Sequence, residues 1–223
     1  MIPIHRLIRT RRKTIALIVE RDGTLTVRAP LRLRDATIRQ IVADKEDWIR
    51  AKQAESRLLE PPLLPKEYVE GESFWYLGQV HKLQLVDSLN SALSLNGNFR
   101  LSRSAVPEAR TVFERWYREQ ARQIIAARLK RYAREHGHSH RGIRITSART
   151  RWGSCSSRGT LSFTWRLVMA PLDVIDYLVV HELVHLEIHN HSKAFWSRVE
   201  EILPDYRACR EWLKKNGHLL NLE

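Results

Sequence analysis

The sequence has few cysteines, no long apolar run and no internal repeat or low-complexity segment. Cys155 and Cys209 are its two cysteines among 223 residues, and they are not clustered. Such cysteine usage fits a reducing compartment better than a disulfide framework. The longest apolar runs have about five residues, as at 15–19, whereas a membrane-spanning helix needs about 20. A secretory apolar segment is also absent, so we expect a cytoplasmic protein with no membrane partner.

The positive charge is concentrated in the middle of the chain. The whole chain has a net charge of +13, and residues 100–151 alone carry 13 arginines, one lysine and four glutamates. Arginine binds phosphate and carboxylate through two parallel hydrogen bonds, so anionic substrates or partners are one interpretation. The other interpretation is a solvated helix face.

Three histidines and a glutamate have the spacing of an open zinc site. His181 and His185 are four residues apart, so on a helix they lie on one face with Glu182 beside them. His191 completes the ligand set if the helix ends and the chain bends back, for which Asn190 is a candidate position. Three protein ligands leave one tetrahedral position vacant, which is typical of catalytic zinc. We therefore predict one zinc ion per chain.

The residues around this motif favour a buried helix. Pro171 suits a helix start, and the positions before His181 are apolar on nearly every side. Ser192 can cap a following helix that contains Phe195 and Trp196. Histidines on a buried helix need polar partners, and a metal ion would provide them.

The predicted chemistry is hydrolysis by a metal-activated water, with Glu182 as general base. A further donor is needed for the developing oxyanion, and the candidates are Arg151, Arg166, His189 and Tyr206. Of these, Arg151, Arg166 and Tyr206 are the predicted substrate-binding residues. His136, His138 and His140 alternate and could bind a second metal, but a solvated loop is favoured because their spacing does not suit a helix.

Local patterns predict a mixed α and β chain. Hairpins are expected where alternating residues flank a turn, and helices where apolar residues recur every three or four positions. The predicted hairpins lie at 14–29, 74–86 and 93–101, the predicted helices at 35–56 and 107–137, and further strands at 143–147 and 160–165. Segment 149–159 has two equally favoured interpretations. Its arginines and small residues suit contact with an anion, or residues 157–159 form an ordinary hairpin turn and Trp152 packs in the core.

These motifs together resemble a known family, the YgjP-like metal-dependent hydrolases, which are relatives of the SprT-type zinc metallopeptidases. The likeness rests on residues 151–156, 174–185, 190–192 and 195–196, and it extends to 28–30, 116–118 and 203–206. It implies that His181, His185 and His191 bind the metal and that Glu182 is the catalytic base. Ile188 stands where the related metzincin pattern has glycine, so the resemblance does not define the route of the chain to His191.

The patterns along the chain predict an α+β fold in two parts, and the resemblance implies a zinc peptidase-like fold. We expect residues 1–104 to form a small amino-terminal β-rich region with one helix. Residues 105–223 are expected to form a zincin-like metal-dependent hydrolase domain, with a long helix, a short antiparallel sheet and the HExxH helix.

Three functions remain open at this point. The first is a zinc metallopeptidase, with 149–155 as a strand that an extended peptide could join. The second, which the resemblance also implies, is a nucleoside triphosphate pyrophosphatase acting on UTP at the same metal site. The third is a nucleic-acid-associated protein with an accessory metal site, which the pI of 10.2 favours but no basic helix with interleaved aromatics supports.

Overall fold

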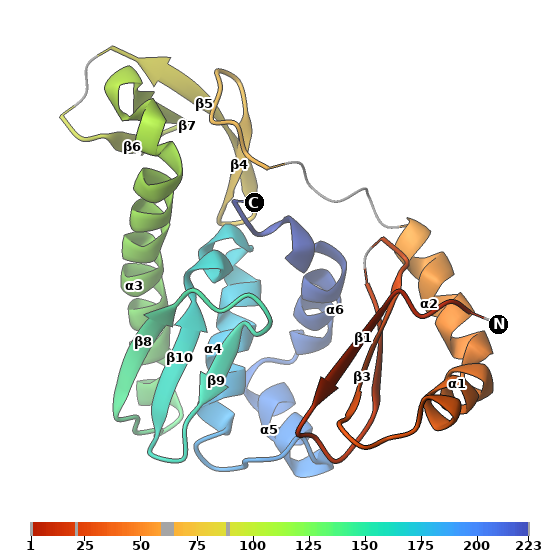
Figure 1. Ribbon diagram of the computed structural model, residues 1–223. Helices are drawn as coiled ribbons and strands as arrows, with labels where there is room; N and C mark the ends of the chain where they lie inside the picture. The colour runs from red at the N-terminus through yellow and green to blue at the C-terminus, as the bar shows by residue number, and fades with distance from the viewer. Residues whose placement is uncertain (1, 21, 59–64, 88–89, 223) are drawn as a thin grey trace. The chain divides into compact units, whose positions relative to one another are not determined.

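A computed structural model of the chain describes residues 2–20, 22–58, 65–87 and 90–222. The contacts divide the chain into two compact units, residues 1–64 and 65–223 (Figure 1). None of the helices in the described ranges is long and apolar enough to cross a membrane.

The first unit is a three-stranded sheet with two helices. Its strands are β1 (Arg6–Thr10), β2 (Ala16–Val19) and β3 (Leu25–Pro30), in the order β1-β3-β2. The predicted hairpin is confirmed, since β2 and β3 pair antiparallel, and β1 joins β3 in parallel. The helices α1 (Asp35–Asp44) and α2 (Glu46–Leu58) replace the single predicted helix. A core that includes Leu25, Val27, Ile38 and Ile49 holds this unit together.

The second unit begins with two hairpins in one sheet. The strands β4 (Ser73–Tyr76), β5 (Gln79–Val86), β6 (Leu93–Asn96) and β7 (Asn98–Ser102) follow the order β4-β5-β7-β6. Both predicted hairpins are confirmed, and β5 and β7 pair in parallel. Phe74 and Phe99 pack on Phe113 of the next helix, at centroid distances of 4.3 and 5.1 Å. Because of this packing, residues 65–104 belong with the second unit, whereas the sequence placed the domain boundary after residue 104.

A long helix and a second small sheet frame the site. The 3-10 turn η1 (Arg103–Glu108) leads into α3 (Ala109–Glu135), and β8 (Gly142–Thr146), β9 (Gly153–Cys155) and β10 (Thr160–Thr164) follow in the sheet order β8-β10-β9. The predicted antiparallel sheet is wrong in one respect, because β10 pairs with β8 in parallel and with β9 antiparallel. The segment between β8 and β9 crosses the end of β10, so β10 lies between the other two strands.

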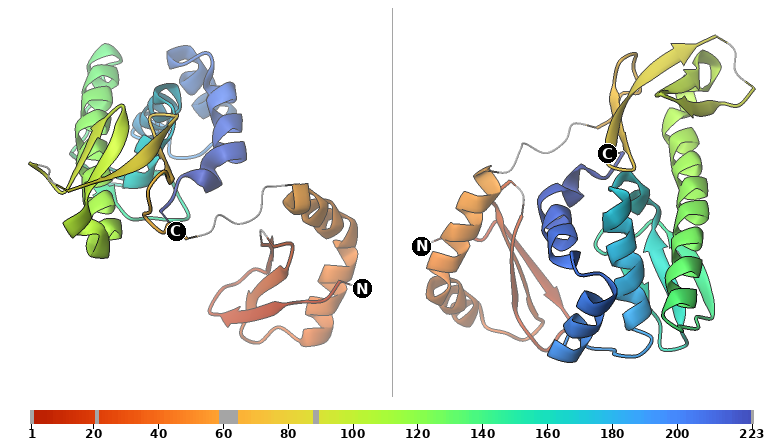
Figure 2. Two further views of the ribbon diagram at one scale, coloured as in Figure 1. Left: turned by 90° about the horizontal axis from the view of Figure 1, so that it is seen from above. Right: turned by 180° about the vertical axis from the view of Figure 1, so that it is seen from behind.

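The remaining helices complete the second unit. After η2 (Trp165–Met169) come α4 (Leu172–Val184), α5 (Lys193–Ile202), α6 (Tyr206–Asn216) and η3 (Gly217–Leu219). Helix α4 packs against α3, α5, α6 and β9. Figures 1 and 2 show α3 and α4 on one face of the β8-β10-β9 sheet. Ten of the thirteen α4 residues are buried, so this helix forms the centre of the unit's core.

Candidate metal centre

The carboxyl end of α4 and the loop that follows bring three imidazoles together. The Nε2 atom of His191 lies 3.1 Å from that of His181 and 3.2 Å from that of His185. Among the described residues, this is the one group of histidines, cysteines and carboxylates close enough to share a metal ion. His136, His138 and His140 form no second such group, and the side chain of His138 is buried at 1% exposure, which corrects the expectation of a solvated loop.

The chain reaches His191 without a left-handed residue. Helix α4 ends at Val184 with His185 as its C-cap, and Ile188 donates its backbone N–H to the carbonyl of Val184 in a final turn. The chain bends at Asn190, as predicted, but none of the described residues 185–192 has a positive φ, so the bend is not left-handed. Asn190 instead accepts a hydrogen bond from the backbone N–H of Ser192 through its side chain, at 3.2 Å. Ser192 then occupies the N-cap position of α5, as predicted, although its side chain makes no cap bond.

The donor chemistry of the three histidines fits a metal ion. The Nδ1 atom of His185 lies 3.0 Å from the carbonyl of Ile188, so Nδ1–H donates there and Nε2 keeps its lone pair. Burial lowers the pKa of His181 to about 3, and burial also lowers the pKa of His185. Both imidazoles are therefore neutral at physiological pH, which is the form that binds metals.

The ring of Phe195 packs against all three imidazoles. Its ring centroid lies 4.9 Å from that of His181, 4.5 Å from that of His185 and 4.9 Å from that of His191, and Phe195 itself is fully buried. Trp196 stacks on the outer side of His191, at 5.6 Å and 25°. Helix α5 thus restricts the positions of all three imidazole rings.

Glu182 is buried beside the histidines and faces β9. It is 4% exposed, and its Oε2 atom has no hydrogen-bond partner among the described residues. Burial raises the pKa of the Glu182 carboxyl to about 8, an effect that the positive charge of Arg151 partly offsets. Gly153 lies against this carboxylate: a Cβ atom added to Gly153 would stand 2.4 Å from Oε1 of Glu182. The sequence drew attention to the segment containing Gly153 but did not identify this contact.

These groups share one open cavity of about 470 Å³. Its lining includes the three imidazoles, Glu182, His189 and the β9 residues Gly153, Ser154 and Cys155. His191 is exposed at its rim, so the site is accessible to solvent. A buried carboxyl group, three imidazoles and a strand edge are therefore within reach of one bound molecule.

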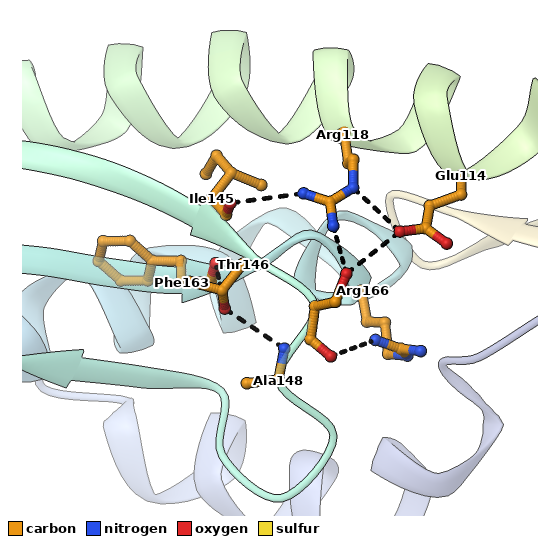
Figure 3. Close-up of polar contacts among 8 residues, drawn as sticks. Glu114, Arg118, Ile145, Thr146, Ala148, Phe163 and Arg166 are labelled. Carbon is orange, nitrogen blue, oxygen red and sulfur yellow. Dashed lines mark hydrogen bonds and ion pairs between the residues drawn. The ribbon is translucent and has the colours of Figure 1, made fainter. Parts of the chain in front are cut away.

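Arg166, one of the predicted substrate residues, lies outside this cavity. It is 8% exposed, its guanidinium stacks 4.4 Å from the ring centroid of Trp165, and it donates a hydrogen bond to the carbonyl of Ser147. Figure 3 shows it beside Arg118 and Glu114 at the end of β8. Its contacts are those of a residue that fixes the segment between β8 and β9.

Tyr206 and Arg151 also lie away from the imidazole cavity. Tyr206 is buried and stacks on Trp196 at 5.4 Å, so one aromatic ring separates it from His191. Arg151 lines an adjoining cavity together with Arg158. Of the two interpretations of segment 149–159, the hairpin turn with Trp152 in the core is confirmed, since Gly159 has a positive φ and Trp152 packs on the core.

A cluster of three imidazoles that could hold a metal ion, beside a buried carboxylate in a mixed α and β fold, fits a metal-dependent hydrolase. The chain belongs to the YgjP-like family, because the family model described as "YgjP-like, metallopeptidase domain" matches residues 13–216. The predicted resemblance is thereby confirmed. Among solved structures, the metallopeptidase zymogen abylysin of Pyrococcus abyssi is similar to 40% of this chain and 93% of its own, with 22% sequence identity and a TM-score of 0.37. A search of curated proteins found no match.

Proposed function

We propose that this protein is a zinc peptidase that holds one ion per chain on His181, His185 and His191. The observation that carries the proposal is the convergence of three imidazole nitrogens and the buried Glu182 carboxylate in one cavity below the edge of β9. Zinc bound by three nitrogen donors keeps a vacant position, acts as a Lewis acid and lowers the pKa of water. Peptide is the substrate class because the matching family model is that of a metallopeptidase domain.

Glu182 is the general base in this proposal. Its carboxylate takes a proton from the attacking water and later returns that proton to the leaving amine nitrogen. Burial raises the pKa of this group, which makes its carboxylate a stronger base than an exposed one. Its Oε2 atom is free of partners among the described residues and is therefore available for the transfer.

The open edge of β9 is the proposed docking site for the peptide backbone. Trp152 and Ser156 direct backbone groups toward β10, where Thr164 and Thr160 bond them. Since these directions alternate along a strand, Gly153 and Cys155 direct their N–H and C=O groups away from β10. An extended peptide that paired with them would carry its scissile bond past Glu182 and the imidazoles.

His189 is the best-supported donor for the developing oxyanion. Of the four candidates from the sequence, it is the one that lines the imidazole cavity. Arg166 and Tyr206 are engaged in the packing contacts described above. The oxyanion role is therefore assigned to His189 as part of the proposal.

Glu182→Gln is the test of this function. The substitution keeps the size of the side chain and removes the base, so hydrolysis of an unfolded protein or a fluorogenic peptide should fall at least about a hundredfold, with zinc content unchanged. Metal content and turnover are measured on the same preparation, with nucleoside triphosphates as second substrates. Undiminished peptide hydrolysis, or hydrolysis of nucleoside triphosphates alone by the unsubstituted protein, would contradict the proposal.

A further inference from the structure

We propose that the open face of the β8-β10-β9 sheet is a subsite that selects acidic side chains of the peptide substrate. This inference rests on the proposed peptidase function and adds a substrate preference to it. Three arginines, Arg144, Arg151 and Arg158, line a cavity next to the imidazole cavity.

The cavity has a volume of about 510 Å³ and a polar lining. Besides the arginines, it is lined by small hydroxyl residues such as Ser154 and Ser162. The strand register explains why these groups meet: Ser162 of β10 lies opposite Arg144 of β8 on one side and opposite Ser154 of β9 on the other. Residues directly opposite one another in a sheet project from the same face. Their neighbours Leu161 and Phe163 are buried, so the face with Arg144 is the one turned away from the helices.

Among the described residues, no aspartate or glutamate lines this cavity. The carboxyl group of Glu182, in the adjoining imidazole cavity, interacts electrostatically with Arg151. Within the described ranges, none of the three arginines forms a hydrogen bond or a salt bridge, and each is exposed. Three positively charged groups around one cavity repel one another, and a bound anion would reduce this repulsion. A carboxylate can accept two parallel hydrogen bonds from one guanidinium. The cavity is therefore suited to an anionic group.

The arginine cavity adjoins the imidazole cavity. Ser154, Cys155 and Ser157 line both. Side chains alternate between the two faces of a sheet, so a peptide strand added at the edge of β9 would place every second side chain on the face of Ser154. That face carries the arginines, whereas the other face leads to Gly153 and Glu182. The expected substrate is thus an extended peptide with aspartate or glutamate at alternate positions.

The test compares two fluorogenic peptides that differ only at every second position, which is aspartate in one and asparagine in the other. Wild-type protein should cleave the aspartate peptide with a kcat/KM at least about tenfold higher. Arg144→Gln and Arg158→Gln should each reduce this preference several-fold and leave the kcat/KM for the asparagine peptide unchanged. In both variants, the preference for the aspartate peptide should depend less on salt concentration. Arg134→Gln, an exposed arginine on α3, is the matched control and should keep the full preference.

A binding measurement separates failure of the subsite from failure of the peptidase function. The zinc-loaded Glu182→Gln protein is titrated with each labelled peptide, and fluorescence anisotropy is followed. Tighter binding of the aspartate peptide, lost in Arg144→Gln or Arg158→Gln, supports the subsite even if neither peptide is cleaved. Equal affinity for both peptides overturns it. Binding of a nucleoside triphosphate that is tighter than that of the aspartate peptide and depends on the same arginines also overturns it, in favour of a phosphate site.

Discussion

At the scale of single residues, Gly153 leaves room for the carboxylate of Glu182. A Cβ atom at this position would approach Glu182 Oε1 to 2.4 Å, which is far closer than a Cβ atom approaches an oxygen to which it is not bonded. Gly153→Ala should therefore displace the carboxylate from the imidazoles and lower kcat at least about tenfold, with zinc still bound. The peptidase assay and elemental analysis measure both effects.

Gly142→Ala is the control for this substitution. Gly142 lies in β8 of the same sheet, and a Cβ atom there meets nothing within 4 Å. This variant should keep its activity. Equal kcat for Gly153→Ala and wild type would show that the position of Glu182 does not depend on Gly153.

His138 predicts a pH dependence of stability. Burial lowers the pKa of His138, and Glu187 only partly offsets this effect. The folded chain therefore binds the proton less readily than the unfolded chain, so the stabilisation is complete above the unfolded pKa of about 6.5 and is lost as pH falls below it. His138→Gln should make the free energy of unfolding fall less between pH 7.5 and pH 5.5.

Denaturant unfolding of chelator-treated protein at the two pH values measures this difference. Treatment with chelator removes the pH dependence of metal binding from the comparison. His5→Gln, at an exposed histidine of the first unit, should match wild type. An unchanged loss of stability in His138→Gln would contradict the assignment.

Some residue roles could not be predicted from sequence because they depend on burial. Arg166 was predicted to bind substrate, since an arginine near the motif is compatible with an anion site. In the structure it stacks on Trp165 and bonds a backbone carbonyl, a role set by contacts between distant segments. The convergence of His181, His185 and His191 was predictable, because helical spacing alone brings two of them together and the third follows within a short loop.

At the scale of elements, the loop between α4 and α5 positions the third imidazole. The carboxylate of Glu187 in this loop lies 2.9 Å from Nε2 of His138 and 3.8 Å from Nε of Arg198 on α5. Glu187→Ala should free the loop and weaken zinc affinity about tenfold, because residues that support metal ligands have effects of that size. Competition with a chromophoric chelator measures the affinity.

Glu201→Ala controls for the loss of a surface charge. Glu201 pairs with the same Arg198, at 2.8 Å, but lies on α5 and not in the loop. Its removal should leave zinc affinity unchanged. If both variants bound zinc as wild type does, the loop would be held by other contacts.

Hairpins whose turns have a characteristic local sequence were predictable, whereas strands that form only by pairing with a distant strand were not. The hairpins around Gly23, Gly78 and Gly97 follow from turns whose glycines have positive φ. Strand β1 was missed, because its exposed, arginine-containing sequence has no apolar face of its own and it forms only by pairing with β3. The parallel pairing of β8 and β10 depends likewise on the path of the intervening segment.

At the scale of the whole molecule, the proposed site lies entirely within the second unit. The imidazoles, Glu182, β9 and the arginine cavity all come from residues 144–191, inside the unit that begins at Pro65. The sequence predicted two parts but misplaced their boundary relative to these units, because hairpin signals do not reveal that Phe74 and Phe99 pack on α3. The surplus of arginine in residues 100–151 was visible in the sequence, but the cavity it lines was not.

The zinc content of the purified protein tests the central claim most directly. Elemental analysis should find close to one equivalent of zinc in wild type and in Glu182→Gln, and a loss of most of it in His185→Ala and in His191→Ala. Circular dichroism would verify that each variant is folded. Full retention of zinc in both histidine variants would contradict the account, because the three imidazoles would then not be the metal ligands.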